Sequence, residues 1–387
     1  MEATDTAHLK LKTNDGTIPL AFVKSENDIF LASRVKGTRW PSNILRQGIA
    51  SIELEGKNSA YSASLLTELD AKNMIMQIFV QKYGEENTLR WYGKDFRIIR
   101  LRAFSVPETP GKQRHYYSWL ESEFDAIAHS YDHHIYDNSV NSLLRERSIR
   151  LMQKTFQSPG KLLEIGCGTG TETLEILKAG HEVVAVDISQ NMLDSLKLKA
   201  EKAGLISNLT LVKMNAVSIG ELANAYGPGF FDGIYSTYGA LNCVTEIERI
   251  PASLHELLKR EGKLVLGIYN RLCVSEILGY AAKGKFRHAV ARLKKEIREG
   301  DSRFCIDIYA YTFMEIREIF HEFFSPVYVE GVPIIIPPSN FVNYVDKFRN
   351  RFELVKRMDQ LIGSRWPFTI LGDHFLTVME PNPTKVK

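Results

Sequence analysis

The sequence is poor in cysteine and in net charge, and each shortage excludes a class of protein. Only four of the 387 residues are cysteines, and none belongs to a Cys-x-x-Cys pair. We therefore expect no disulfide framework and no metal site, and reduced thiols suit a cytoplasmic protein. The 49 Lys and Arg residues stand against 46 Asp and Glu, an excess too small to favour nucleic acid as a partner.

Long apolar runs are lacking as well. No stretch approaches the ~20 apolar residues of a membrane-spanning helix, and residues 1–15 lack the apolar centre of a signal peptide. The composition is that of a globular protein, with 44% hydrophobic and 25% charged residues. At roughly 150 residues per domain, the length predicts two or three domains.

A change of pattern divides the chain. Residues 1–105 carry short alternating apolar runs and one helical pattern, which predicts a small β-barrel. Residues 106–117 contain two prolines and a glycine and are expected to form a linker. From residue 118 to 387 strands and helices alternate, which predicts an α/β domain with a parallel sheet covered on both faces. We expect helical insertions near 272–303 and 339–368.

The strongest chemical signal is KLLEIGCGTGTETLEIL at residues 161–177. An apolar strand runs into Gly166, Gly168 and Gly170, and a helix follows at once. These glycines allow a tight turn and let a ligand approach the backbone. The NAD fingerprint requires glycine at position 171, where this sequence has threonine.

Two acids accompany the loop, and the first, Glu164, opposes a pyrophosphate but suits a cationic ligand. Glu164 precedes the first glycine by two residues, and Asp187 ends the next strand, where a carboxylate reaches ribose hydroxyls. With these pieces in order, residues 161–269 resemble a class I S-adenosylmethionine (SAM)-dependent methyltransferase. The matching stretches are LLEIGCGTG, VVAVDIS, FFDGIYSTYGALN and LLKREGKLVLGIYNR, with FDAIAHSYD resembling the segment that folds over the cofactor.

This resemblance implies a Rossmann-like sheet of seven strands and a role for each matching residue. Glu164 would hold the amino group of SAM and Asp187 the ribose hydroxyls. Asn215 stands where the family usually has an aspartate that faces the adenine amino group. The side chain of Cys167 is expected to be a small filler in the loop. The implied cofactor-binding residues are Glu164, Gly166, Cys167, Gly168, Gly170, Asp187, Ile188, Met192, Asn215, Ala216, Ser236 and Tyr131.

Methyl transfer from a sulfonium requires mainly alignment of the reactants, so the sequence does little to identify the acceptor. A base is needed only where the nucleophile must lose a proton. The candidate catalytic residues are Tyr238 near the methyl group, His374 at the start of the last strand, and His133 in the segment over the cofactor, with His134 beside it. The alternative interpretation is a core aromatic side chain for Tyr238 and a surface or hydrogen-bonded structural residue for each histidine. The family's Asn-Pro-Pro-Tyr signature is absent, which favours O- or C-methylation of a small molecule.

The insertion near 272–303 is basic. A solvated helix face is one interpretation of this charge; an anionic substrate or a peripheral membrane contact is the other. Its cations are Lys283, Lys285, Arg287, Arg292, Lys294, Lys295 and Arg298.

Residues 15–54 resemble a flavin-type split barrel of the pyridoxamine-phosphate-oxidase-like and deazaflavin-dependent-reductase superfamily. The resemblance implies a homodimer and FMN or a deazaflavin as a second cofactor. A barrel without a cofactor, kept for dimerisation or docking, is the alternative. The residues suited to a cofactor phosphate are Ser33, Arg34, Lys36, Thr38, Arg39 and Asn43.

Three functions remain open at this point. The first is a SAM-dependent methyltransferase acting on a small-molecule acceptor. The second is a bifunctional reductase-methyltransferase that uses a flavin or deazaflavin in the barrel. The third is a non-catalytic SAM-binding scaffold or sensor.

Overall fold

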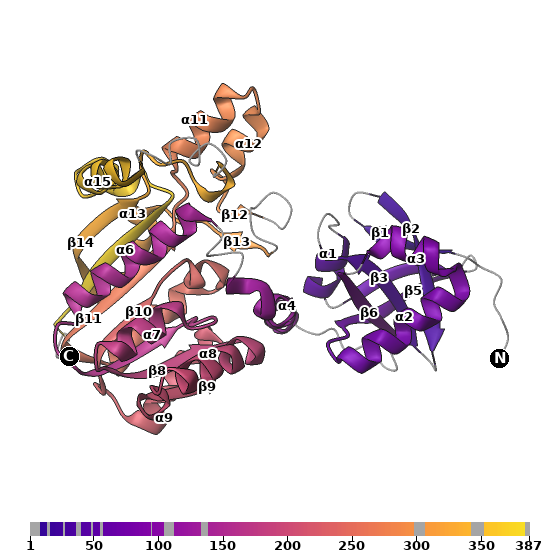
Figure 1. The fold of residues 1–387 in the computed structure, drawn as a ribbon, viewed down its shortest axis with the longest axis horizontal. Helices are drawn as coiled ribbons and strands as arrows, with labels where there is room; N and C mark the ends of the chain where they lie inside the picture. The colour runs from indigo at the N-terminus through magenta and orange to yellow at the C-terminus, as the bar shows by residue number, and fades with distance from the viewer. Residues whose placement is uncertain are drawn as a thin grey trace. The chain divides into compact units, whose positions relative to one another are not determined.

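The computed structural model of the chain forms two compact units, Met1–Ala126 and Ile127–Lys387 (Figure 1). Residues 112–117, which the sequence analysis assigns to a linker, form the first turns of helix α4 (Lys112–Ile127). No proline or glycine follows Gly111 there. The structure describes residues 8–13, 16–25, 28–35, 40–47, 49–54, 57–93, 95–103, 112–132, 138–297, 306–341 and 352–383.

Unit 1 is a small antiparallel barrel. Its six strands are hydrogen-bonded in the order β1-β2-β3-β6-β5-β4, and pairing of β1 with β4 closes the barrel. This is the small barrel that the strand patterns predict; its kinship with flavin-type split barrels stays a prediction. The strands are β1 (His8–Thr13), β2 (Gly16–Ser25), β3 (Asp28–Arg34), β4 (Ile49–Leu54), β5 (Lys57–Leu65) and β6 (Phe96–Ala103).

Period-two alternation explains how these strands divide their side chains. Val23 and Ile98 pack against Phe79 of α2 (Leu69–Tyr83), while Phe22 and Ile99, one position away, are fully buried on the opposite strand face. Two further helices, α1 (Trp40–Gln47) and α3 (Glu85–Tyr92), were not predicted from the sequence. Each has only eight residues, too short for a clear helical period.

Unit 2 is built on the predicted seven-stranded sheet, in the order β14-β15-β11-β10-β7-β8-β9. Strands β9, β8, β7, β10 and β11 run parallel, and β15 runs antiparallel to both of its neighbours. The strands are β7 (Lys161–Ile165), β8 (Glu182–Asp187), β9 (Leu209–Lys213), β10 (Phe231–Ser236), β11 (Leu258–Tyr269), β14 (Phe324–Val332) and β15 (His374–Pro381).

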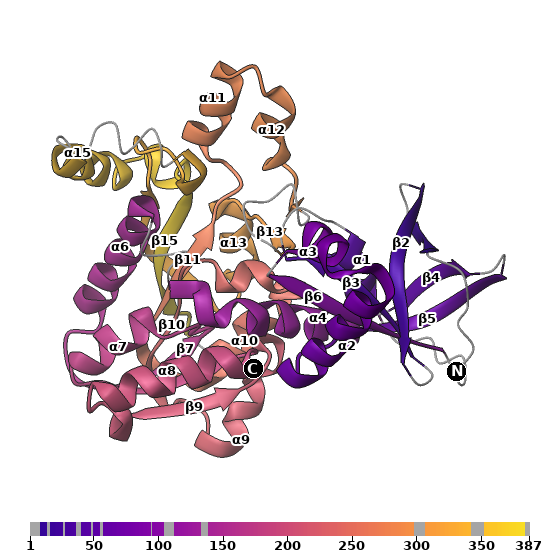
Figure 2. The same cartoon turned by 45° about the vertical axis from the view of Figure 1, so that its right-hand side comes forward.

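Helices cover both faces of this sheet (Figure 2). Successive residues of β7 belong to two different hydrophobic cores, one on each face of the sheet. Leu162 packs with residues of α6 (Ser139–Thr155), α7 (Thr171–Lys178) and α8 (Gln190–Lys202). Leu163 packs with residues of α10 (Ile250–Leu257) and α13 (Phe313–Phe320). Strands buried on both faces read as continuous apolar runs, which is why the sequence predicts them well.

Two helical insertions interrupt the end of the domain. The first holds α11 (Val274–Ala282) and α12 (Phe286–Ala291), which project from the rest of unit 2 in both views (Figures 1 and 2). The second holds α15 (Phe352–Gly363), between β14 and β15. Across the described part of the chain, no helix is long and apolar enough to cross a membrane.

Candidate functional site

The glycine loop joins β7 to α7 and needs two of its glycines for packing. Gly166 and Gly170 have φ of 75° and 85°, values that L side chains rarely adopt. A Cβ on Gly166 would lie 2.3 Å from Cβ of Ala240, and one on Gly170 would lie 2.2 Å from Cδ1 of Leu196. The loop is therefore held tightly against its neighbours, and because it follows the last residue of β7 it lies at the carboxyl edge of the parallel strands.

Asp187 fixes this loop to the next strand. Its Oδ2 accepts a hydrogen bond from the backbone N–H of Gly168 at 2.8 Å, and its Oδ1 accepts one from Ser189 at 2.9 Å. The predicted adenine neighbours follow directly: Ile188 is half-buried, and Met192 is buried in the first turn of α8. Carboxylate oxygens accept hydrogen bonds, so this group is of a kind that suits hydroxyls such as those of ribose.

Glu164 lies buried under the loop in an environment rich in negative charge. Its Oε2 accepts hydrogen bonds from Thr173 Oγ1 at 2.6 Å and Tyr235 OH at 3.0 Å. Burial is the main reason that the pKa of Glu164 is raised to about 8; the nearby Glu172 adds to the rise, and these hydrogen bonds oppose it. Glu172 forms a buried ion pair with Arg145, but its Oε1 is buried without a hydrogen-bond partner. Two carboxyls, one cation and an unsatisfied oxygen fit a positively charged ligand.

Residues of the predicted covering segment lie on the loop. Tyr131 is half-buried, and Cε1 of its ring lies 3.7 Å from the position that a Cβ on Gly168 would take. Asp132 accepts a hydrogen bond from Thr169 Oγ1 at 2.6 Å and pairs with Lys199 at 2.5 Å. Burial opposes ionisation of Asp132, but the hydrogen bonds from Lys199 and Thr169 outweigh it and hold its pKa below the usual range. These contacts place residues 131–132 over the glycine loop.

Asn215 and Ala216 follow β9 at the same edge of the sheet. Asn215 Oδ1 accepts a hydrogen bond from the backbone N–H of Val217 at 3.1 Å, which caps the 3₁₀ turn that begins at Ala216. The amide is therefore fixed by the local turn, with one lone pair of Oδ1 remaining. The predicted histidines His133 and His134 lie outside the described residues.

The residues after β10 form a strained turn. The Ser236 hydroxyl donates to the carbonyl oxygen of Ile165 at 2.9 Å and so ties β10 to β7. Tyr238 has a φ of 56°, and no other non-glycine residue in the described ranges has a positive φ. The guanidinium of Arg145 lies 4.3 Å from its ring centroid, and the ring of His374 stacks on it at 6.0 Å. Strained residues of this kind concentrate at functional sites.

His374 begins β15 opposite Tyr269, the last residue of β11, so it lies at the carboxyl edge as predicted. Its Nδ1 is 3.0 Å from Asp373 Oδ2. Arg292 Nη1 donates to the other oxygen of Asp373 at 2.6 Å and to Glu276 at 2.7 Å. All of these side chains are buried. The sequence allowed Arg292 to belong to a solvated basic helix face. That interpretation is wrong for this residue, because its side chain is buried.

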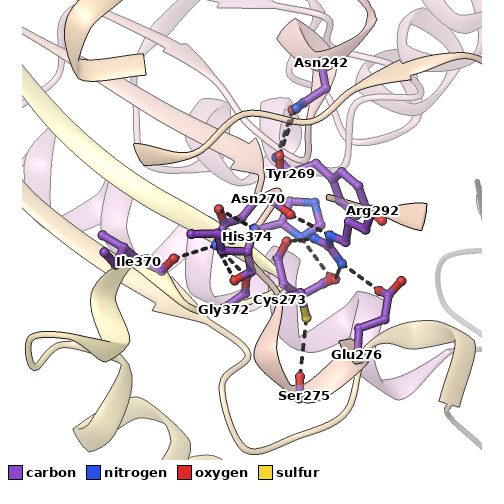
Figure 3. A network of polar contacts seen from close by, with 12 residues as sticks. Asn242, Tyr269, Asn270, Cys273, Ser275, Glu276, Arg292, Ile370, Gly372 and His374 are labelled. Atoms are coloured by element: carbon purple, nitrogen blue, oxygen red, sulfur yellow. Dashed lines mark hydrogen bonds and ion pairs between the residues drawn. The ribbon is translucent and has the colours of Figure 1, made fainter. Parts of the chain in front are cut away.

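Two asparagines fix the backbone around this network, and the sequence analysis assigned no role to either. Asn242 Nδ2 donates to the carbonyl oxygen of Tyr269 at 3.1 Å, and its Oδ1 accepts from the N–H of the same residue at 2.9 Å (Figure 3). Asn270 Nδ2 lies within hydrogen-bonding distance, 2.9–3.0 Å, of three carbonyl oxygens, those of Leu272, Ile370 and Gly372. The chain entering β15 is thus tied to the chain leaving β11.

The buried cysteines do not offer reactive thiols. Burial raises the pKa of Cys167 well above its usual value, as suits a small filler, and raises that of Cys273 to about 11. Cys273, Glu276 and Asp373 bring ligand-type atoms within 4.8 Å of one another. The guanidinium of Arg292 already binds both of these carboxylates, so the positive charge that they require is present.

The barrel holds a separate cavity of about 560 Å³. Arg34 Nε and Nη2 donate to the backbone carbonyls of Trp91 and Arg90 at 2.9 and 2.6 Å, and Ser33 Oγ donates to a neighbouring carbonyl. Among the predicted phosphate-binding residues, Lys36, Thr38, Arg39 and the side chain of Asn43 lie outside the described part. The cavity is lined by Ser33 and Arg34 together with His8, Pro19, Leu20, Ala21, Ala32, Trp40, Trp91 and Tyr92.

Comparison with known proteins finds similarity to methyltransferases. Residues 162–262 match the model of a methyltransferase domain. The chain is 32% identical over 170 residues to the demethylmenaquinone methyltransferase of Thermobifida fusca, covering 41% of this chain and 66% of that protein. It is 27% identical over 143 residues to a probable cobalt-precorrin-6B C(15)-methyltransferase of Saccharolobus solfataricus, covering 35% and 68%.

The solved structures include a 1,6-didemethyltoxoflavin-N1-methyltransferase from Burkholderia thailandensis, with a TM-score of 0.45 and 15% identity over 73% of this chain and 96% of that chain. The matched part of the chain spans about half to two thirds of the length of the curated relatives.

Proposed function

We propose that this chain, an enzyme with a class I SAM-dependent methyltransferase domain, methylates an oxygen or carbon atom of a small-molecule acceptor. The single observation that carries this proposal is the position of His374. The imidazole is oriented by Asp373 at 3.0 Å and stacks on Tyr238, at the same sheet edge as the glycine loop. A buried, oriented imidazole is suited to take a proton from an acceptor.

The residues around the glycine loop fit SAM. Glu164 and Glu172 would face the ammonium and sulfonium charges, and Asp187 would receive the ribose hydroxyls. When bound there, SAM supplies an electrophilic methyl group on a good leaving group. Residues 131 and 132 would exclude water by lying over the loop. This arrangement provides the alignment that an in-line displacement needs.

His374 and Tyr238 would prepare the acceptor. With the proton of the neutral imidazole on Nδ1 and shared with Asp373, the lone pair lies on Nε2. Nε2 would accept the acceptor's O–H or acidic C–H proton as the new bond to the methyl carbon forms and the carbon–sulfur bond breaks. Tyr238 would form one wall for the reacting atoms, because its strained backbone and stacked ring leave it little freedom.

The test is in two stages. Titration calorimetry should detect SAM binding to wild-type protein and a loss of at least tenfold in affinity for Asp187→Ala. Formation of S-adenosylhomocysteine should then be measured with a panel of phenolic, enolic and quinol acceptors. We expect turnover by the wild type and a fall of about 10²–10⁴ for His374→Ala with SAM affinity retained. Normal turnover by His374→Ala would exclude His374 as the general base. SAM binding without turnover on any acceptor would favour a scaffold or sensor.

The barrel supports a second candidate function because its cavity carries Ser33 and Arg34 beside two tryptophans. We propose FMN or a deazaflavin as the ligand, which would make the chain a bifunctional reductase-methyltransferase. Protein purified without added ligand should then show flavin-type absorbance, and Trp40→Ala should reduce it. A colourless protein that does not bind FMN or a deazaflavin in a fluorescence titration would leave the barrel a docking or dimerisation module.

A further inference from the structure

Exposed apolar side chains concentrate on the two insertions of unit 2. Among the described residues, 19 large hydrophobic side chains are exposed, and 11 of them lie within residues 272–297 and 333–370. Scattered exposed hydrophobic residues are normal on a protein surface, but a concentration marks an interaction site. We call the exposed faces of α11, α12 and α15 the insertion surface.

The spacing of these residues is helical. Phe286 and Val290 lie one helical turn apart on α12, Leu293 follows in the turn just after the helix, and the three side chains are 41–68% exposed. Such a stripe normally faces the core of a protein, whereas here it faces outward. Leu278 on the adjoining helix α11 is also exposed, so both helices of this projecting pair (Figures 1 and 2) present apolar groups.

Helix α15 repeats this pattern. Leu354, Met358 and Leu361 follow one another at intervals of four and three residues and are 48–62% exposed. Trp366, just beyond the helix, is 82% exposed. A large aromatic side chain in this position is typical of the boundary between water and a membrane.

Positive charge surrounds the apolar stripe of α12. Four exposed lysines, Lys283, Lys285, Lys294 and Lys295, lie immediately before and after it in the chain, while Glu296 is the nearest exposed acid. The entire chain has an excess of only three basic residues, so this local excess is a real concentration of charge. Glu276, the acid of α11, is buried and paired with Arg292 and does not offset the lysines.

We infer that the insertion surface docks on an anionic lipid bilayer. The apolar stripes would enter the boundary between headgroups and acyl chains, and the lysines would meet anionic headgroups. A second copy of the chain fits less well, since a two-fold interface places the same surfaces face to face and brings the lysines together. The inference does not depend on methyl transfer, because it concerns binding alone.

The insertion surface is connected to the candidate active site through Arg292. Arg292 follows α12 directly and is buried against Asp373, whose other oxygen holds His374. A bilayer bound through α12 would therefore contact a segment that is connected, through Arg292 and Asp373, to the residue that would receive the acceptor's proton.

Co-sedimentation of the full-length chain with vesicles tests this inference. We expect binding to phosphatidylcholine vesicles that contain phosphatidylserine, at least tenfold weaker binding to phosphatidylcholine alone, and weakening by added salt. The double variant Phe286→Ser/Val290→Ser should lose at least tenfold in affinity, as should Lys294→Gln/Lys295→Gln. Because the substituted side chains are exposed, thermal unfolding should be unchanged.

The matched control is Leu198→Ser, which removes an exposed leucine from α8, away from the insertions; it should bind like wild type. Failure of the wild type to bind either vesicle would overturn the inference, as would equal binding by the Phe286→Ser/Val290→Ser variant. A wild-type dimer in solution that this double variant converts to monomer would assign the insertion surface to a second copy instead.

Discussion

Asp373 and His374 are adjacent in the chain and also bonded through their side chains, with 3.0 Å between Oδ2 of Asp373 and Nδ1 of His374. Adjacent residues of a regular strand point to opposite faces, so this contact requires Asp373 to lie just before β15 begins. Arg292 holds the other oxygen of the same carboxylate at 2.6 Å. The carboxylate is thus fixed on one side by a cation and on the other by the imidazole that it orients.

Replacing the orienting carboxylate should impair the base without affecting the cofactor site. For Asp373→Asn we expect a fall in kcat of about 10–10³, because the amide no longer selects the tautomer with the proton on Nδ1. SAM affinity should stay within about twofold. Nitrogen chemical shifts of His374 would report the change of tautomer independently of turnover. The control is Glu276→Gln, which also contacts Arg292 but not His374; a fall as large as that of Asp373→Asn would contradict an orienting role.

The raised pKa of Glu164 predicts that SAM binds more tightly as pH rises toward 8. The carboxyl with pKa about 8 is largely protonated in the free protein at pH 7, and a cationic ligand favours its ionised form. Binding should therefore release a proton, and affinity should rise by up to about tenfold per pH unit and level off above pH 8. Calorimetry in buffers of different ionisation enthalpy measures this release.

The Glu164→Gln variant serves as the reference for that experiment, since the titration of SAM itself is common to both proteins. It should bind more weakly above pH 8 and show a smaller dependence on pH. Equal pH dependence in the two proteins would contradict the proposed contact between Glu164 and the ligand.

The same group should make the ligand-free protein lose stability as pH rises from about 4.5 to 8. The pKa of Glu164 is raised from 4.5 to about 8 on folding, so the unfolded chain binds fewer protons between these values. Stability contributed by the protonated form is then complete below about pH 4.5 and is lost as pH rises toward 8, at up to about 1.4 kcal/mol per unit. Urea unfolding at pH 5.5, 6.5 and 7.5 should show a steeper loss for wild type than for Glu164→Gln.

The backbone of the glycine site could be predicted from the sequence, whereas its electrostatics could not. Near-continuous apolar runs such as Leu162–Ile165 identify buried parallel strands, and glycines at alternate positions identify the turn. Glu172 and Arg145 gave no such signal, because their pairing depends on how α6 packs against α7. Local sequence alone does not distinguish a buried acid from the many that lie on exposed helix faces.

Arg292 illustrates the same limit at longer range. In the sequence it lies in a basic run, and only the fold brings it to Asp373, 81 residues along the chain. The position of His374 could be predicted because the expected antiparallel last strand begins at the carboxyl edge of the parallel strands, and the register with Tyr269 confirms that position. Its orienting partners could be recognised only in three dimensions.

Two glycines of the loop should differ sharply in their tolerance of alanine. At Gly170 the added Cβ would lie 2.2 Å from Leu196, so we expect Gly170→Ala to cost about 1–3 kcal/mol of stability from overpacking alone. Gly168 also has a positive φ, but its Cβ would meet only Tyr131, at an ordinary 3.7 Å. Gly168→Ala should therefore be less destabilising in urea unfolding. Equal losses would show that backbone conformation, rather than packing, determines the cost.

Removing Arg292 should be among the most destabilising changes in the second unit. Arg292→Met would leave Glu276 and Asp373 as two buried carboxylates without their cation, and breaking a buried pair in this way costs about 3–5 kcal/mol. Lys294→Met removes a positive charge two residues away from an exposed position and should change stability by less than about 0.5 kcal/mol. Urea unfolding of the two variants measures the contrast. Similar, small effects would mean that Arg292 behaves as one of the exposed cations of this basic segment, and the network that orients His374 would then lack its anchor.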